Sequence, residues 1–374
     1  MSGSPIIKKS VISKKPVVKI TKQVSLKRKV VQRKEIDVSR LVPTPCIPLN
    51  LECSGRHEGG FSLGSIVNLI GDSHAGKTLF ALSILAECSL LSRFDEYELE
   101  YDDVESANEF DTPYLFGTKC AERINENHRS KTFEDFADRI SNLIDSKQKF
   151  IYILDSFDAL TTRDAIKLEK KNRLARSKDN KESGSYGDGK PKLASEFFSM
   201  RAQDIDDSES LVIIISQTRD NLGFGAMFNP KVRSGGRALK FYSAFEIWLA
   251  MQKKEKIGKR TLITDVQAKL TKNKLTGRHG EAIFPILFDY GIDNIAACIN
   301  FLTVEGTTAQ KWTGTKSALN TKGFYVLDSG KHPSYKDIVR HIEENDLEKE
   351  LALVCQASYD ASIEALRSDR KRRY

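Results

Sequence analysis

The 374-residue sequence predicts an α/β fold: a core with a central, mostly parallel β-sheet, a small α-rich C-terminal domain and a basic N-terminal arm. Three observations support this prediction. Short apolar runs alternate with longer stretches of helical periodicity, which is typical of strand–helix–strand units. A glycine-bearing loop joins a strong strand pattern directly to a strong helix pattern. Both ends of the chain are rich in Lys and Arg and differ from the stretch between them.

The overall composition excludes several classes of protein. Hydrophobic residues make up 40% and charged residues 29%, as in soluble globular proteins. No apolar run is long enough to cross a bilayer, and the first residues lack the apolar stretch of a signal peptide. The six cysteines show no metal-binding spacing, so we expect reduced thiols in a cytoplasmic protein. A net charge of +8 favours a polyanionic partner without identifying it.

Residues 1–35 form the basic arm, in which Glu35 is the single acidic residue. Prolines and β-branched residues interleave without a helical period, which predicts a flexible or extended segment. The alternatives for it are contact with nucleic acid, a solubilising tail and a strand added to a neighbouring subunit. Residues 36–64 have a mixed composition with three prolines, and we expect a loop that leads into the core.

The core is organised around residues 66–78, where an apolar strand pattern ends in the motif G-x-x-x-x-G-K-T and a helix pattern begins at once. In such a loop the backbone N–H groups surround a phosphate, Lys77 reaches the β- and γ-phosphates, and the Thr78 hydroxyl binds Mg²⁺. The positive end of the following helix faces the same anion. The sequence therefore predicts a bound nucleoside triphosphate. The expected contacts are Gly71, Asp72, Ser73, His74, Ala75, Gly76, Lys77 and Thr78.

Acidic residues follow two further strand patterns. Residues 98–105 end in Asp103 and Glu105, and the apolar run 150–154 is followed by Asp155 and Ser156. Ligands of open parallel sheets bind beyond the carboxyl ends of the strands, so these acids are expected to face the nucleotide. In nucleoside triphosphatases an acidic residue that follows an apolar strand helps to hold Mg²⁺. We assign this role to Asp155, together with Thr78. A solvated acidic loop is the alternative for residues 102–105.

Two segments are expected to bind DNA. Residues 161–194 are polar, basic and glycine-bearing, and predict a long loop that either binds DNA or is an unstructured insertion. Residues 220–236 follow a third apolar strand, 211–215, whose end carries an amide, Gln217, able to bind a γ-phosphate. The candidate DNA contacts are Lys190, Lys192, Arg219, Lys231, Arg233, Gly235, Gly236 and Arg237.

The rest of the chain predicts three more core strands, at 244–251, 262–270 and 282–288. Lys272 and Lys274 flank Asn273 between the last two of these strands. The alternative to a functional role is that the two lysines only form a solvated hairpin end. Helical spacing returns from residue 293 and predicts the small C-terminal domain, which closes on a run of arginines.

Taken together, these motifs resemble the RecA recombinase family in its bacterial and bacteriophage branch, from about residue 61 to residue 302. Residues 71–78 match its phosphate loop, and residues 153–156 are similar to its VVDS strand. The segment GGRALKFYS at 235–243 is close to the family's GGNALKFYA. Residues 102–105, 216–219, 270–275 and 284–292 resemble its IDAE, NQ-x-R, VVKNKI and FQILYGEGI segments in the same order.

The resemblance implies a DNA-dependent ATPase that forms filaments on single-stranded DNA and exchanges strands with double-stranded DNA, with ATP and Mg²⁺ as cofactors. It places the RecA-like core at residues 36–292 and the C-terminal domain at 293–374. Glu105 would be the general base, with Asp103 as the alternative, and Gln217 the γ-phosphate sensor. Lys272 and Lys274 would reach the ATP of a neighbouring subunit, and Phe288 would lie near the adjoining adenine.

Several features depart from the family pattern. The arm has no counterpart of the family's N-terminal helix, the first DNA loop is longer and more basic, and His74 stands where the family usually has Ser. The basic C-terminus contrasts with the acidic tail of bacterial members. These departures favour a phage-encoded relative acting in a bacterial cytoplasm. Two alternatives stay open: a RecA-fold motor or helicase-like ring, and a DNA-binding mediator that does not exchange strands.

Overall fold

The computed structural model describes residues 35–106, 110–176, 189–220, 231–233, 236–257, 260–303 and 335–366. In this part of the chain a ten-stranded sheet has the order β12-β11-β10-β9-β3-β7-β6-β4-β5, with β8 paired to β7. The strands of this sheet are β3 (Ser65–Gly71), β4 (Glu98–Asp103), β5 (Ile124–Asn125), β6 (Phe150–Asp155), β7 (Leu211–Asp220), β8 (Lys231–Arg233), β9 (Phe245–Ile257), β10 (Arg260–Asn273), β11 (Glu281–Leu287) and β12 (Gly291–Ile292). Strands β1 (Leu41–Val42) and β2 (Phe61–Ser62) form a separate pair.

The two halves of the sheet differ in strand direction. Strands β9, β3, β7, β6, β4 and β5 run parallel to one another, whereas β9, β10, β11 and β12 pair antiparallel. The parallel strands β3, β6 and the first part of β7 are buried throughout, as expected for strands covered on both faces. The prediction of an α/β fold with a central, mostly parallel sheet is confirmed.

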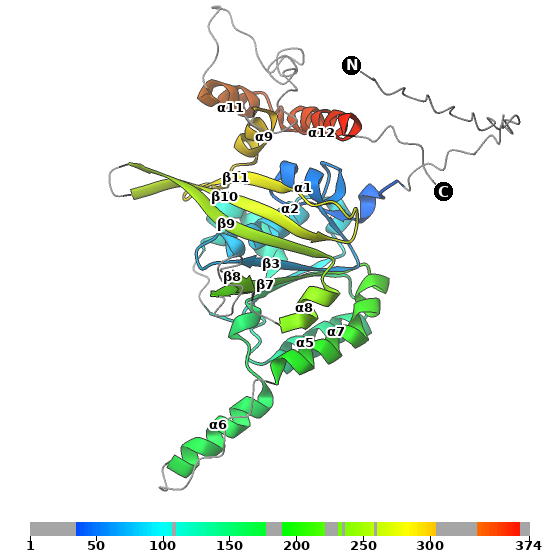
Figure 1. Ribbon diagram of the computed structural model, residues 1–374, viewed down its shortest axis with the longest axis vertical. Coiled ribbons are helices and arrows are strands. Elements are labelled where there is room, and N and C mark those ends of the chain that lie inside the picture. Colours follow the sequence, from blue (N-terminus) through cyan, green and yellow to red (C-terminus); the bar gives the residue numbers. More distant parts are fainter. Residues whose placement is uncertain are drawn as a thin grey trace, which may run out of the picture. The chain divides into compact units, whose positions relative to one another are not determined.

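Helices cover both faces of the sheet (Figure 1). The longer ones are α2 (Lys77–Ser89), α5 (Phe133–Asp145), α6 (Arg163–Arg176), α7 (Lys190–Asp207), α9 (Asn294–Thr303), α11 (Tyr335–Glu344) and α12 (Glu348–Ala365). The shorter ones are α1 (Ile47–Ser54), α3 (Thr112–Phe116), α4 (Thr118–Arg123), α8 (Gly236–Tyr242) and the 3₁₀ turns η1 (Val38–Arg40), η2 (Ser92–Phe94) and η3 (Phe157–Ala159).

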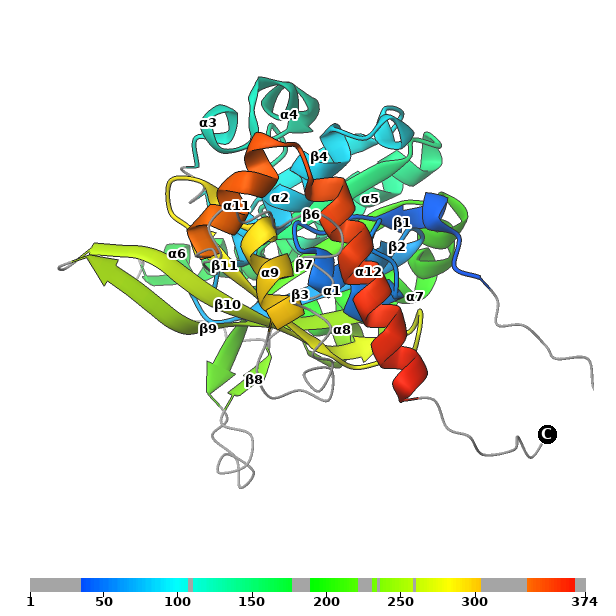
Figure 2. The ribbon, with the colours of Figure 1, turned by 90° about the horizontal axis from the view of Figure 1, so that it is seen from above.

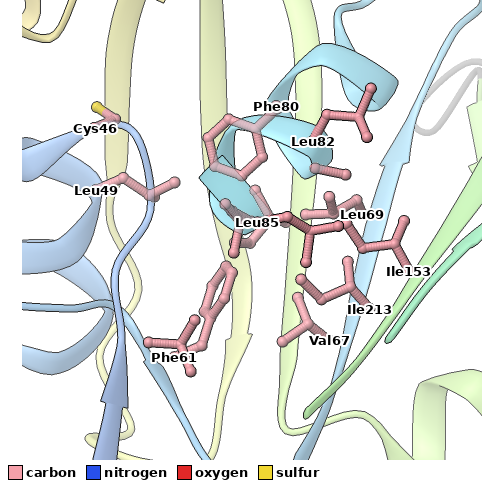
Figure 3. Packing of buried hydrophobic residues seen from close by; sticks show 14 of the residues in the cluster. Cys46, Leu49, Phe61, Val67, Leu69, Phe80, Leu82, Leu85, Ile153 and Ile213 are labelled. Carbon is pink, nitrogen blue, oxygen red and sulfur yellow. The ribbon is translucent and has the colours of Figure 1, made fainter. Parts of the chain in front are cut away.

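The alternation of side chains along β3 divides the core between two faces. Val67 and Leu69 pack with Phe80 and Leu85 of α2, as the close view in Figure 3 shows. Ile66, one position earlier, belongs to the opposite cluster, which α5, α7 and α8 cover. This is the period of two expected of a strand buried on both faces.

Two segments expected to be loops contain helices. Within residues 36–64, α1 begins at Ile47 and has Pro48 in its first turn, where the backbone N–H groups have no partner within the helix and a proline costs no hydrogen bond. Gly55 ends the helix in a left-handed conformation. Within residues 161–194, α6 and the start of α7 replace the predicted loop. The prediction treated a basic, polar stretch as irregular, although Lys, Arg, Leu and Ala all favour helices. Residues 177–188 lie outside the described part of the chain.

The C-terminal helices have a core of their own. Ile299 of α9, Ile342 of α11 and Cys355 of α12 pack together with Leu51 of α1. The helices α9, α11 and α12 lie beside one another in both ribbon views (Figures 1 and 2). The six cysteines are buried free thiols, which agrees with the expected reduced state. Across the described ranges no helix is long and apolar enough to span a membrane. The predicted basic arm, residues 1–35, lies outside the described residues apart from Glu35.

Candidate nucleotide-binding site and DNA-facing surface

The phosphate loop leaves β3 at Gly71 and enters α2 at Lys77. A Cβ on Gly71 would lie 2.6 Å from the Leu249 carbonyl oxygen of β9, so the loop lies directly against that strand and only glycine fits. Gly76 has a φ of +79°, a left-handed conformation that glycine adopts without strain. The Lys77 ammonium is buried and donates to the carbonyl oxygens of Gly71, at 3.0 Å, and Asp72, at 2.7 Å. Burial lowers the pKa of Lys77, while nearby carboxylates act in the opposite direction.

The two predicted Mg²⁺ ligands are in contact with each other. Thr78 Oγ1 donates to Asp155 Oδ2 at 2.6 Å, and the buried Tyr101 hydroxyl donates to the same oxygen at 3.2 Å. Burial raises the pKa of Asp155, and the hydrogen bonds from Thr78 and Tyr101 oppose that rise. No group of three or more His, Cys, Asp or Glu side chains among the described residues could hold a metal by itself. Mg²⁺ is usually held by one or two protein oxygens together with substrate phosphates, and Thr78 and Asp155 offer such oxygens.

The predicted base and the predicted sensor also meet. Glu105 Oε1 accepts a hydrogen bond from Ser156 Oγ at 2.5 Å and another from Gln217 Nε2 at 3.1 Å. The backbone N–H of Gln217 donates to Asp158 Oδ2 of η3 at 2.8 Å. Asp103, the alternative base, is buried, whereas Glu105 is exposed at the end of its strand. The structure thus brings Glu105, Ser156 and Gln217 together from three separate strands.

Lys77, Thr78, Asp155 and Glu105 line one cavity of about 540 Å³, a volume typical of small-molecule sites. Ser156 and Gln217 contact it only through their hydrogen bonds to Glu105. Its polar side carries His74, Gly76, Lys77, Thr78, Tyr101, Asp103, Glu105 and Asp155. Its apolar side carries Leu79, Phe110, Leu115, Met251, Val266, Ile286, Leu287 and Phe288, with Lys254, Thr261, Thr264 and Gly291 alongside. A Cβ on Gly76 would lie 2.6 Å from Ile286 Cδ1, so β11 lies directly over the phosphate loop. An apolar wall next to a phosphate loop is suited to a nucleotide base.

The sequence analysis found one member of that wall, Phe288, which is 65% exposed. It missed Phe110, Leu115, Met251 and Ile286, which come from the segment after β4 and from β9 and β11. An apolar residue in a strand has the same pattern whether it faces the core or a ligand, so no sequence signal separates the two.

Lys272 and Lys274, the lysines expected to act across a subunit interface, cap a helix in this chain. The ammonium groups of Lys272 and Lys274 donate to the Phe241 carbonyl at 3.0 and 3.2 Å, and Lys272 also contacts the Lys240 carbonyl. These carbonyls end α8, where the helix dipole favours positive charge. Neither lysine lines the cavity within its own chain.

The candidate DNA contacts differ in exposure. The side chain of Lys192 is 83% exposed and that of Arg219 71% exposed, although Arg219 lies 3.7 Å from Asp158. Arg237 is exposed at the start of α8, and Gly236 has a φ of +68°. Gly235 lies outside the described residues.

Two of these candidates are buried, which corrects the prediction for them. Lys190 Nζ donates to the carbonyl oxygens of Phe157, Asp158 and Leu160 at 2.7–3.2 Å, so it fastens the start of α7 to η3. The guanidinium of Arg233, 11% exposed, pairs with Glu246 of β9. The Lys190 ammonium is satisfied inside the protein, and the Arg233 guanidinium is engaged by Glu246 and the Gly236 carbonyl oxygen.

Asp72 links the phosphate loop to the second predicted DNA loop. Its carboxylate accepts hydrogen bonds from Thr218 Oγ1 of β7 and from Lys231 Nζ of β8. These donors, Lys231 first, hold the pKa of Asp72 below its usual value. These contacts therefore favour the charged form of the Asp72 carboxylate.

Comparison with known proteins identifies the family. The family described as the RecA N-terminal domain matches residues 25–293. The chain belongs to the RecA family. Among its RecA-family relatives, Protein RecA of Legionella pneumophila (strain Lens) is 26% identical over 315 residues, covering 81% of this chain and 83% of that protein. Protein RecA of Nitratidesulfovibrio vulgaris is 28% identical over 272 residues, covering 70% of this chain and 67% of that protein.

A relative outside bacteria is the mitochondrial DNA repair protein recA homolog of Dictyostelium discoideum. It is 27% identical over 259 residues, which cover 66% of this chain and 51% of that protein, so the match spans about half of its length. The predictions of the RecA family and of a RecA-like recombination and repair ATPase are confirmed at the level of the family.

Proposed function

We propose that this chain is an ATP- and Mg²⁺-dependent recombinase that polymerises on single-stranded DNA and pairs it with a homologous duplex. The observation that supports this best is the convergence of Lys77, Thr78, Asp155 and Glu105, from three separate segments, around one cavity, with Gln217 of β7 hydrogen-bonded to Glu105. Each of these side chains has the chemistry that phosphoryl transfer to water requires.

The phosphate loop binds the triphosphate. Lys77 exchanges its two carbonyl partners, Gly71 and Asp72, for β- and γ-phosphate oxygens, which satisfies its buried charge better. Thr78 and Asp155 would hold Mg²⁺, whose charge would neutralise part of that on the phosphates. The base lies against the apolar wall of the cavity, with Phe288 at its rim.

Glu105 orients and deprotonates the attacking water. Its carboxylate is held in place by Ser156 and Gln217, so its lone pairs are directed before substrate arrives. Gln217 then moves its amide from Glu105 to the γ-phosphate, which reports the nucleotide state to β7 and to the segment that follows it. The same amide residue is therefore the point at which hydrolysis and DNA binding are coupled.

Assembly completes the site. Lys272 and Lys274 do not reach the cavity of their own chain, and we propose that they stabilise charge on the triphosphate of the adjacent subunit in a helical filament. DNA phosphates are contacted by the exposed members of the predicted set, Lys192, Arg219, Lys231 and Arg237. The division into an arm at 1–35, a core at 36–292 and a C-terminal domain at 293–374 belongs to this proposal, as does a phage origin with action in a bacterial cytoplasm.

Mixing two inactive variants tests the shared site. Lys77→Ala removes the phosphate-loop ammonium, and the double variant Lys272→Ala/Lys274→Ala removes the lysines of the neighbour; each alone should lower DNA-stimulated hydrolysis by about 10²-fold or more. In an equal mixture about a quarter of head-to-tail interfaces combine an intact loop with intact lysines, so hydrolysis should recover towards that fraction. No recovery, with both variants still binding single-stranded DNA, would show that the lysines do not act across an interface.

A further inference from the structure

The segment from Thr162 to Lys190, which contains α6, contacts the core at both of its ends. At its start, Thr162 Oγ1 accepts from the backbone N–H of Ala165 at 3.1 Å and so caps the helix. The Arg163 guanidinium binds Asp135 at 2.9 Å and Asp138 at 2.7 Å, both on α5. At the return of the chain, Lys190 is clamped to η3. The start of α6 is therefore held against α5, and the start of α7 against η3, the turn that follows β6.

The body of α6 has no buried residue over its 14 positions, and it extends away from the sheet in Figure 1. Six of its side chains are basic (Arg163, Lys167, Lys170, Lys171, Arg173 and Arg176) and two are acidic (Asp164 and Glu169). An isolated polar helix of this length is only marginally stable in water when none of its faces packs against the protein, so a bound partner would stabilise it.

The basic side chains are only partly paired. Lys167 lies 3.1 Å from Asp164 and Arg176 lies 3.8 Å from Glu169. Lys170, Lys171 and Arg173 form no ion pair with another described residue. Lys167, Lys170 and Lys171 stand at positions i, i+3 and i+4, so they share one side of the helix, where like charges repel one another. A polyanion bound along that side would relieve the repulsion.

We propose that the basic side of α6 binds duplex DNA, as the second DNA molecule of the reaction. This rests on the proposed function, because only a pairing enzyme needs a second DNA site. A helix is about 10–12 Å across and the major groove of B-DNA about 12 Å wide, so the two fit. Single-strand sites commonly combine basic side chains with aromatic side chains for base stacking, and α6 contains no aromatic residue.

The position of α6 suits this role. η3, between β6 and α6, carries Asp158, which accepts from the backbone N–H of Gln217 and pairs with Arg219. The turn that precedes α6 in the chain therefore contacts the predicted γ-phosphate sensor directly. A duplex held on α6 lies at the same edge of the sheet as the candidate single-strand contacts, where pairing would take place.

Charge removal on α6 tests the proposal in the full-length protein. The α6 variant carries Lys167→Gln, Lys170→Gln, Lys171→Gln and Arg173→Gln, which keep helix propensity. The control variant removes the same charge from exposed lysines elsewhere, with Lys119→Gln, Lys131→Gln, Lys147→Gln and Lys349→Gln. Each protein is assembled on unlabelled single-stranded DNA with a non-hydrolysable ATP analogue. Binding of a labelled duplex of unrelated sequence is then measured by fluorescence anisotropy from low to high salt.

The α6 variant should bind duplex at least about tenfold more weakly than wild type, and the slope of log affinity against log salt should fall by about three to four. Its affinity for single-stranded DNA and its DNA-stimulated ATP hydrolysis should stay within about twofold of wild type, and the control variant should match wild type in all three.

Three results would overturn the assignment: unchanged duplex binding by the α6 variant, an equal loss of single-strand binding, or an equal loss in the control variant. Competition by polyglutamate as strong as that by duplex would assign α6 to an acidic protein instead. Wild-type protein that binds duplex through α6 but shows no DNA-stimulated hydrolysis would refute the proposed function and leave the duplex site standing.

Discussion

The ion pair between Asp72 and Lys231 gives a quantitative prediction about coupling between the nucleotide and DNA sites. The substitution Asp72→Asn keeps the shape of the side chain and removes its charge. The two side chains are 49% and 46% exposed, so the pair lies in solvent, where such pairs contribute about 0.2–1 kcal/mol. Freed from Asp72, Lys231 becomes available to a DNA phosphate. Affinity for single-stranded DNA without nucleotide should therefore rise by up to about fivefold.

Fluorescence anisotropy with a labelled oligonucleotide, at low salt and without nucleotide, measures this gain. A double-mutant cycle with Lys231→Ala is the control, since the gain should vanish when the lysine is absent. It should also shrink as salt rises, because exposed charges are screened. Unchanged or weaker binding by Asp72→Asn, or the same gain in the Lys231→Ala background, would refute the reasoning.

Three further predictions concern single side chains. Burial raises the pKa of Glu52 to about 7, so the folded protein keeps a proton between about pH 4.5 and 7 that the unfolded chain has lost. The free energy of unfolding should thus fall by up to about 3 kcal/mol as the pH rises from about 4.5 to 7. Glu52→Gln should abolish this pH dependence in urea titrations. Gly71→Ala places a methyl 2.6 Å from the Leu249 oxygen and should lower the free energy of unfolding by about 1–3 kcal/mol. Gln217→Met should keep ATP binding and lose at least about tenfold of the DNA-stimulated hydrolysis rate.

Each of these has a contradicting outcome. For Glu52, a pH dependence of the free energy of unfolding that persists in the Glu52→Gln variant would contradict the prediction. For Gly71, the matched control is Gly189→Ala, whose added methyl meets nothing within 4 Å, and equal stability of the two variants would contradict the packing argument. For Gln217, full DNA stimulation in the methionine variant would remove the sensor role.

Local sequence was sufficient for the phosphate loop and the strands around it. Their signals are a fixed spacing of glycines, a lysine and a threonine, and apolar runs whose burial on both faces leaves no other arrangement. Glu105 and Asp155 line the cavity because the chain order places them near the ends of parallel strands, which share one edge of the sheet. Their catalytic and metal-binding roles stay predictions.

The errors arose where distant segments decide the environment of a charge. Lys190 stands in a basic, glycine-bearing stretch and resembles a surface lysine, but three carbonyl groups around η3 bury its ammonium. Arg233 is similar, because its partner Glu246 belongs to another strand. The apolar wall of the cavity was missed for the same reason, since Phe110, Met251 and Ile286 meet only after folding.

DNA-dependent hydrolysis in an assembled polymer is the central claim, and one preparation can test it. ATP hydrolysis is measured with and without single-stranded DNA, and the same samples are imaged by negative-stain electron microscopy. We predict strong stimulation by DNA together with helical filaments, both abolished by Lys77→Ala. Stimulated hydrolysis on closed rings, or by particles that never polymerise, would contradict the account and favour a DNA motor.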